Sequence, residues 1–312
     1  EFKMGSIEAD EVAKSKLRRK SSDSLQMSES FSVHSTTNGT NNRDDDAGAF
    51  LADFQNAPCY LRRDYVLTGY RVGGSYSTAL QAMLNPFQLQ LHNEFWNAWT
   101  MVLGVLFSTW CFVSKFQTLP ASSRPTAVLL WTVVVTHFPF SFGLHSFIGI
   151  SESARRTWRT LDVFMIELNS AILAIALGNL VFRDSVSFLG YSALNTSVFL
   201  FNVYTTMISR RIWNIPKKQL SRDIRNQVVI YLLPMIFQSL YFRDYEAAEI
   251  TIATCIIIAI GGFLYANHIP ERIVPGGFDS FGCSHNLMHI CAIAAHYCEW
   301  KFLEHMAAVI IN

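Results

Sequence analysis

Long apolar segments separated by short polar ones recur along the chain from Asn97 onward. A helix needs about 20 consecutive apolar residues to cross the hydrocarbon core of a bilayer. Seven segments approach this length: 97–116, 126–150, 161–182, 186–208, 228–242, 247–265 and 285–300. Pro234 interrupts the fifth, and two histidines enter the seventh early. The pattern predicts an all-α membrane protein with a seven-transmembrane helix bundle.

The part of the chain before the first segment has a different composition. The stretch 21–46 is rich in Ser, Thr, Asn and Asp and has few apolar residues, so it cannot bury enough surface to offset the entropy of ordering. Apolar and aromatic residues return between 50 and 91, with breaks at three glycines and at Pro86. We therefore expect a disordered tail at 1–48, a juxtamembrane collar at 49–94 and the transmembrane domain at 95–312.

Composition narrows the class of protein further. Half of the 312 residues are hydrophobic and 16% are charged, which is too apolar for an ordinary soluble domain. A net charge of +1 gives no indication of a nucleic-acid partner. The six cysteines are scattered and form no CxxC pair, so neither a disulfide framework nor a cysteine metal site is indicated.

The charges of the short loops predict an orientation. Ten basic residues follow the second, fourth and sixth segments: Arg155, Arg156, Arg159, Arg210, Arg211, Lys217, Lys218, Arg222, Arg225 and Arg272. The loops of the other side offer four: Lys115, Arg124, Arg183 and Arg243. Because loops rich in Lys and Arg stay in the cytosol, we expect the tail and the collar to be cytosolic and the C terminus to lie outside. The first 48 residues contain no apolar core of a cleavable signal peptide, which agrees with a cytosolic N terminus.

This topology predicts that three histidines meet near the cytosolic helix ends. His145 lies near the end of the second segment, and His285 and His289 are one helical turn apart at the start of the seventh. Residues four apart share a helix face. Each histidine taken singly could be an ordinary interfacial residue, but three at one depth favour a Zn2+ site with an open fourth position.

Two further residues are candidates for catalysis through water on that zinc. Asp162, at the start of the third segment, would hold the zinc-bound water, although a carboxylate at a helix start also interacts favourably with the helix dipole. Ser141 precedes His145 by one turn and would orient its imidazole or the water. The alternative for Ser141 is a bond to its own helix backbone.

Other polar residues show how selective this prediction is. At 1.5 Å per residue, His296 lies about 16 Å along the helix from His285, and His137 about 12 Å from His145. Neither is expected to share the ion. Glu94 precedes the first segment. We expect it to be a buried anchor among the inner helix ends, facing the arginines of the loop after the second segment, with an interfacial acid as the alternative.

Several sequence blocks resemble those of the progestin and adipoQ receptor family, and most of all its membrane progestin receptor branch. They cover about 65–298 and include Thr68-Gly69-Tyr70-Arg71, Leu91-His92-Asn93-Glu94, Asn97, Trp99-Thr100, Ser141, His145, Asp162, Pro270-Glu271-Arg272, Phe278-Asp279, His285 and His289. Met101 departs from the pattern, because the family usually has a histidine after Trp-Thr.

The resemblance implies a seven-helix bundle with a cytosolic N terminus and with Zn2+ held by His145, His285 and His289. Asp162 would act through water. It also implies a receptor in the plasma membrane that binds a steroid or lipid ligand. Membrane lipids would surround its helices. Such a receptor would signal to a cytosolic partner such as a G protein.

The alternative is an intramembrane zinc-dependent lipid amide hydrolase of ceramidase type. Zinc with an open position lowers the pKa of its water to about 7, and Asp162 could then serve as the general base. The resemblance of the family to alkaline ceramidases supports this hypothesis, for which a Golgi or endoplasmic reticulum membrane would be suitable. The two functions are compatible, because a receptor could signal through a released product.

Overall fold

The computed structural model describes residues 49–85, 92–209 and 217–311. All of them belong to the unit formed by 45–312. The tail 1–48, predicted to be disordered, lies outside the described residues, as do Arg210 and Arg211 of the predicted basic loop.

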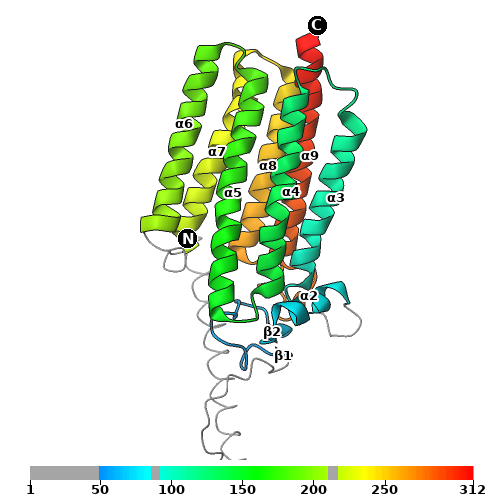
Figure 1. The fold of residues 1–312 in the computed structure, drawn as a ribbon, viewed down its shortest axis with the longest axis vertical. Coiled ribbons are helices and arrows are strands. Elements are labelled where there is room, and N and C mark those ends of the chain that lie inside the picture. Colours follow the sequence, from blue (N-terminus) through cyan, green and yellow to red (C-terminus); the bar gives the residue numbers. More distant parts are fainter. Residues whose placement is uncertain (1–48, 86–91, 210–216, 312) are drawn as a thin grey trace, which may run out of the picture. The chain divides into compact units, whose positions relative to one another are not determined.

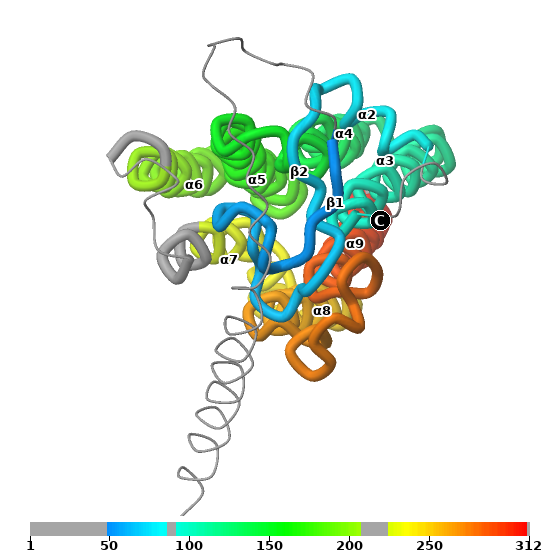
Figure 2. The backbone as a smooth tube through the Cα atoms, turned by 90° about the horizontal axis from the view of Figure 1, so that it is seen from below, coloured from blue at the N-terminus to red at the C-terminus, as the bar shows by residue number. Residues whose placement is uncertain are grey.

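In the described part of the chain, seven long helices form a bundle (Figure 1). They are α3 (Phe95–Lys115), α4 (Arg124–Phe147), α5 (Glu152–Val181), α6 (Ser185–Val203), α7 (Lys217–Tyr241), α8 (Tyr245–Asn267) and α9 (Ser284–Ile311). Six of them pack side by side in a ring, in the order α3, α4, α5, α7, α8, α9 and back to α3. Helix α6 packs outside the ring against α5 and α7, as Figure 2 shows from below.

The composition of these helices fits a membrane environment. Helices α3, α4, α5, α6 with its extension to Thr206, and α8 are long and apolar enough to cross a bilayer. Large apolar side chains on outward faces are exposed, among them Leu106, Val113 and Ile252. Helices α7 and α9 have a comparable length and pack in the same ring, where polar side chains can face the interior.

Three helices are much longer than the apolar segments predict, and one of them is α7, which begins at Lys217 although its segment begins at 228. Helix α5 begins at Glu152, although the apolar segment begins at 161, because Ser151 caps the helix by accepting a hydrogen bond from the Ala154 N–H at 3.1 Å. Asp162 is therefore well inside α5 and not at its start. Helix α9 continues past Trp300 to Ile311. Hydropathy reports the apolar part of a helix, whereas caps and packing determine where the helix ends.

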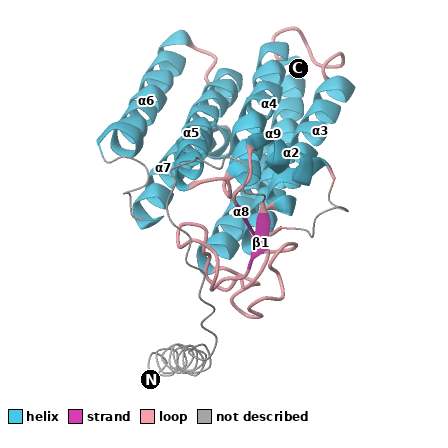
Figure 3. Ribbon diagram, turned by 60° about the horizontal axis from the view of Figure 1, so that its bottom comes forward, coloured by secondary structure: helices cyan, strands magenta, loops and turns pink. Residues whose placement is uncertain are grey.

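The predicted collar contains a small folded layer at one end of the bundle (Figure 3). Strands β1 (Phe50–Ala52) and β2 (Tyr70–Val72) pair antiparallel, and α2 (Tyr76–Leu84) follows with a capping box at Ser75. This layer touches the bundle where α4 ends: the Gly73 N–H donates to the Gly149 carbonyl at 2.9 Å. We call this the collar end; the helix ends at Lys115, Asp184 and Asp244 form the opposite end.

Candidate metal centre

Helices α4 and α9 bring three histidine side chains together at the collar end. His145 lies in the last turn of α4, and His285 and His289 lie in the first two turns of α9. One nitrogen of each ring lies within 4.8 Å of the other two. The ring centroids are 5.0 Å apart for His145 and His285, and 4.5 Å apart for His285 and His289. This cluster could hold a metal ion.

Hydrogen bonds to the Nδ1 atoms of His145 and His289 leave the other nitrogen of each ring free for an ion. The Nδ1 atom of His145 lies 2.8 Å from Oε2 of Glu94, and Nδ1 of His289 lies 2.7 Å from Oγ1 of Thr100. In both rings Nε2 remains available. A histidine that binds a metal usually bonds its other nitrogen to a carboxylate, carbonyl or hydroxyl, which fixes the ring orientation. The residues present therefore fit a metal ion bound through imidazole nitrogen.

Glu94 connects the centre to the collar. It is 4% exposed, forms an ion pair with Arg63 of the collar, and accepts a hydrogen bond from Asn97 Nδ2 at 2.8 Å. Burial alone would raise the pKa of the Glu94 carboxyl, but the Arg63 guanidinium and the His145 ring hold it well below its usual range. The predicted buried anchor is confirmed, but the ion pair is made by Arg63. Of the arginines expected to face Glu94, Arg155 is close enough to interact with it electrostatically, whereas Arg156 pairs with Glu152.

Asp162 is placed differently from the sequence prediction. Its carboxylate lies 3.0 Å from Nε2 of His137, and it is close enough to His145 and His289 to interact with them electrostatically. The Ser141 hydroxyl lies within hydrogen-bonding reach of Asp162. On α4, His137, Ser141 and His145 are each one turn apart and share a face. That spacing was the available signal for the His137–Asp162 pair, which sequence reasoning missed.

His296 lies apart from the cluster, as its helical spacing predicts. Its Nδ1 atom is 2.7 Å from Oε2 of Glu299, and its Nε2 atom accepts a hydrogen bond from Trp300 Nε1 at 3.0 Å. The Ser108 hydroxyl also lies 3.1 Å from Nε2. The His296 ring therefore connects α9 to α3 through Ser108. It does not belong to the three-histidine cluster.

Two residues that support the centre were not identified from the sequence as site residues. Thr100 and Asn97 lie on α3 on the same face as Glu94, at spacings of three residues, and all three are buried. Asn97 also accepts a hydrogen bond from Asn286 of α9. A polar stripe at helical spacing on an apolar span indicates a face directed at the bundle interior, and this stripe was visible in the sequence.

Comparison with known proteins identifies the family. Residues 89–300 match the family described as haemolysin-III related. The chain belongs to this family. The membrane progestin receptor gamma of Homo sapiens is 30% identical over 270 residues, which cover 80% of this chain and 79% of the relative. The membrane progestin receptor delta of Homo sapiens is 27% identical over 271 residues, covering 78% of this chain and 75% of the relative.

A more distant relative extends the comparison within the haemolysin-III-related family. The adiponectin receptor protein of Drosophila melanogaster is 24% identical over 278 residues, which cover 82% of this chain and 60% of the relative. The predicted membership of the progestin and adipoQ receptor family is confirmed. The chain is a multi-pass membrane protein of a seven-span family, and the matched residues include all three clustered histidines.

Proposed function

We propose that this haemolysin-III-related protein is a seven-transmembrane zinc-binding receptor of progestin and adipoQ type that senses a steroid or lipid ligand and signals to the cytosol. The observation that carries the proposal is the three-histidine cluster between α4 and α9. Its rings are oriented by Glu94 and Thr100. The names of the relatives, progestin and adiponectin receptors, support the class of ligand.

Zinc is the metal that the donor set favours. Three imidazole nitrogens without a thiolate are typical of zinc sites that keep one position open. His145, His285 and His289 would hold the ion. When bound, zinc would act as a Lewis acid toward a carbonyl oxygen and lower the pKa of a coordinated water.

The position of the centre supports a role in signalling. An ion there would tie α4 to α9, and Glu94 connects His145 to Arg63 in the collar. A ligand that binds one arrangement of α4 and α9 more tightly than another shifts the protein toward that arrangement. Because Glu94 connects His145 to Arg63, the shift would also change the position of the collar. With the orientation expected from the loop charges, the collar faces the cytosol and a partner such as a G protein. We propose the plasma membrane as the location.

The metal is tested by elemental mass spectrometry on detergent-purified protein. We expect one zinc per chain in the wild type and none in His145→Ala or His289→Ala. The control is His268→Asn, because His268 lies outside the cluster and has a positive φ of 54° that Asn tolerates. Folded wild-type protein that binds no zinc would overturn the zinc assignment.

The ligand is tested by binding of a radiolabelled progestin to membranes that contain the purified chain. We expect saturable binding that unlabelled steroid displaces, and weaker binding in His289→Ala. The His268→Asn variant should bind as the wild type does. Absence of saturable binding to protein with its full zinc content would reject a progestin as the ligand.

A second candidate function is hydrolysis of a lipid amide such as a ceramide in a Golgi or endoplasmic reticulum membrane. It is supported by Asp162, a carboxylate that pairs with His137 and interacts electrostatically with His289, and that could accept a proton there. We expect Asp162→Asn to lose turnover of a fluorescent ceramide while keeping its zinc. Equal turnover in wild type and variant would exclude Asp162 as the base, and no turnover in the zinc-loaded wild type would reject the hydrolase.

A further inference from the structure

A small cavity lies between the collar and the end of α4, beside the metal centre. The space within it that the centre of a water molecule can occupy is about 10 Å³. The collar contributes Arg71 of β2 and His92, and the bundle contributes Ser146, Gly149 and His145 of the metal centre. A cavity of this size has room for one particle of roughly the size of a water molecule.

Three polar side chains that line the cavity have atoms without a hydrogen-bond partner among the described residues. These atoms are Nε and Nη1 of Arg71, Nε2 of His92 and Oγ of Ser146. Arg71 is 7% exposed, His92 4% and Ser146 2%. Because buried polar groups are nearly always paired, three unpaired side chains around one cavity indicate a site for a ligand.

The chemistry of these atoms is that of hydrogen-bond donors. Nδ1 of His92 accepts a hydrogen bond from the Glu94 backbone N–H at 3.3 Å, which places the ring proton on Nε2. The guanidinium of Arg71 can only donate, and the hydroxyl of Ser146 can donate. Burial lowers the pKa of His92 to about 4, so the ring is a neutral donor at pH 7.

The charge of Arg71 is not balanced within the site. Among the described residues, its guanidinium donates a single hydrogen bond, from Nη2 to Oγ1 of Thr78 at 3.3 Å. Glu94 also lines the cavity, but one of its oxygens is engaged by Arg63 and the other by His145 and Asn97. A buried charge is costly unless it is paired. A water molecule would satisfy the donors and would leave the charge unbalanced.

We propose that this cavity binds a small monoatomic anion such as chloride, held by Arg71, His92 and Ser146. Its size excludes phosphate, sulfate and lipid headgroups. The proposal goes beyond the receptor function and does not depend on a metal in the neighbouring centre.

The proposed anion would join the collar to the bundle. The two already lie in direct contact, since a Cβ atom at Gly149 would meet the backbone oxygen of Arg71 at 2.1 Å. Ser146 and Arg71 approach the cavity from opposite sides of this contact, from α4 and β2. Binding should therefore stabilise the docking of the collar on α4.

The experiment measures thermal unfolding of the detergent-purified full chain while chloride replaces gluconate at constant ionic strength. We expect the melting temperature to rise by several degrees and to saturate. In Arg71→Gln the increase should be lost, and in Ser146→Ala the chloride concentration at half effect should rise several-fold. The control is Arg62→Gln, because Arg62 is a collar arginine that bonds the carbonyls of Ala57 and Gln55 outside the cavity.

Two further measurements locate the anion. The titration is repeated on chelator-treated protein, since a metal in the three-histidine centre could itself bind a halide. A chloride effect that disappears with the metal would overturn the proposal. In crystals of the wild type grown in bromide, anomalous scattering should show a peak between Arg71 and His92. An ordered water at that position, or equal melting temperatures in chloride and gluconate, would also overturn it, even if Arg71→Gln does not fold.

Discussion

The hydroxyl of Thr100 bonds Nδ1 of His289 and leaves the other ring nitrogen for the proposed ion. Its oxygen lies 2.7 Å from Nδ1, and both residues are buried. Replacing Thr100 by Val removes this bond and preserves the volume. We expect Thr100→Val to lower zinc affinity by about 10- to 100-fold, as is typical when such a supporting bond is lost.

Competition with a fluorescent zinc chelator measures this effect. The matched variant is Thr160→Val, because within the described ranges the Thr160 hydroxyl bonds the carbonyl of Arg156 at 2.8 Å and no other group. Zinc affinity should be unchanged there. Equal affinities in Thr100→Val and the wild type would show that Thr100 does not orient the ligand.

The Glu94 carboxylate is buried, whereas its partner Arg63 is partly exposed. Replacing Glu94 by Gln would leave Arg63 without its partner charge. Breaking a fully buried pair typically costs about 3 kcal/mol or more, and solvent at Arg63 should reduce this cost to about 1–2 kcal/mol. We expect a marked loss of unfolding free energy in Glu94→Gln. Denaturant titration would measure it against Glu152→Gln, which removes an exposed pair with Arg156 and should cost at most about 0.5 kcal/mol. Similar losses in the two variants would argue against a buried pair at Glu94.

Helices α4 and α5 approach closely at Gly143. A Cβ atom there would lie 2.2 Å from the Trp158 ring, which is closer than atoms can pack. We expect Gly143→Ala to destabilise the protein by about 1–3 kcal/mol, the usual range for an overfilled core.

The chain offers two control glycines for this prediction. A Cβ atom at Gly190 of α6 or at Gly262 of α8 would meet no atom within 4 Å. Alanine is favoured over glycine in a helix by up to about 1 kcal/mol, so these variants should be neutral or more stable. A thermal shift assay compares the three, and a stable Gly143→Ala would contradict the close approach of α4 and α5.

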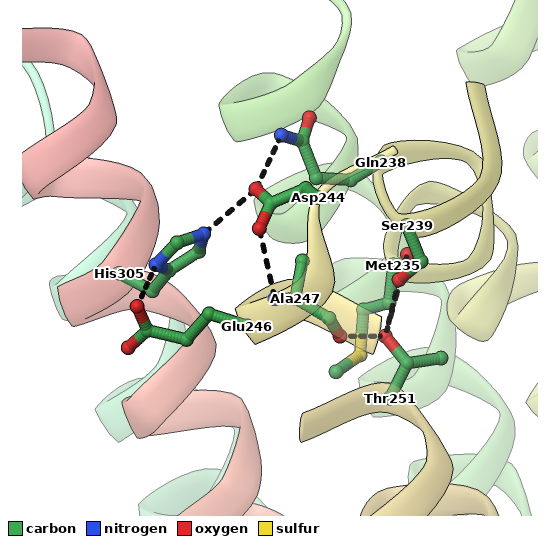
Figure 4. Close-up of polar contacts among 8 residues, drawn as sticks. All are labelled: Met235, Gln238, Ser239, Asp244, Glu246, Ala247, Thr251 and His305. Atoms are coloured by element: carbon green, nitrogen blue, oxygen red, sulfur yellow. Dashed lines mark hydrogen bonds and ion pairs between the residues drawn. The ribbon is translucent and has the colours of Figure 1, made fainter. Parts of the chain in front are cut away.

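Helices α8 and α9 are joined at the opposite end by Asp244 (Figure 4). Its Oδ1 atom caps α8 by accepting from the Ala247 N–H at 3.0 Å, and its Oδ2 atom lies 2.7 Å from Nε2 of His305. Gln238 of α7 donates to the same oxygen at 2.9 Å. One carboxylate therefore connects three helices of the ring.

We expect Asp244→Ala to cost about 2 kcal/mol of unfolding free energy, about half from the lost cap and half from the lost bonds between helices. Asp184→Ala should cost less, because Asp184 caps α6 by accepting from the Ser187 N–H at 2.7 Å and bonds no neighbouring helix among the described residues. Thermal unfolding of both variants provides the comparison. A larger loss in Asp184→Ala would contradict the joining role of Asp244.

The effect of Asp244 should depend on pH. Burial alone would raise the pKa of the Asp244 carboxyl, but the bonds from His305, Gln238 and Ala247 hold it below its ordinary value. Since the folded pKa is depressed, the stabilisation is complete above about pH 4. It is lost as the pH falls through the folded pKa. The difference between the wild type and Asp244→Ala should therefore shrink in acid.

The bundle is a ring whose first and last helices, α3 and α9, are in contact. A metal ion held by the three histidines would add a link between α4 and α9. A ligand that binds only the folded state stabilises it in proportion to the logarithm of its concentration over its dissociation constant. We expect a strong chelator to lower the melting temperature of the wild type. It should leave that of His289→Ala unchanged, and an equal decrease in both would exclude stabilisation through the cluster.

Much of this architecture can be predicted from local sequence. Apolar runs locate the long helices because a helix that crosses the bilayer must be apolar through the whole thickness of the hydrocarbon core. The spacing of His285 and His289, with His145 at the end of a neighbouring span, predicts the cluster. Four-residue spacing fixes a shared helix face, and alternating topology fixes the depth.

Contacts between segments that are distant in sequence could not be predicted in this way. Asp162 was expected at a helix start, but α5 begins ten residues earlier at Glu152. Its pairing with His137 was not expected. Glu94 was expected to face the loop arginines, and its partner is Arg63 of the collar. Hydropathy and helical spacing describe one helix at a time. The partner of a buried charge depends on how helices and collar pack together, because the charge takes whichever opposite group the fold brings within reach.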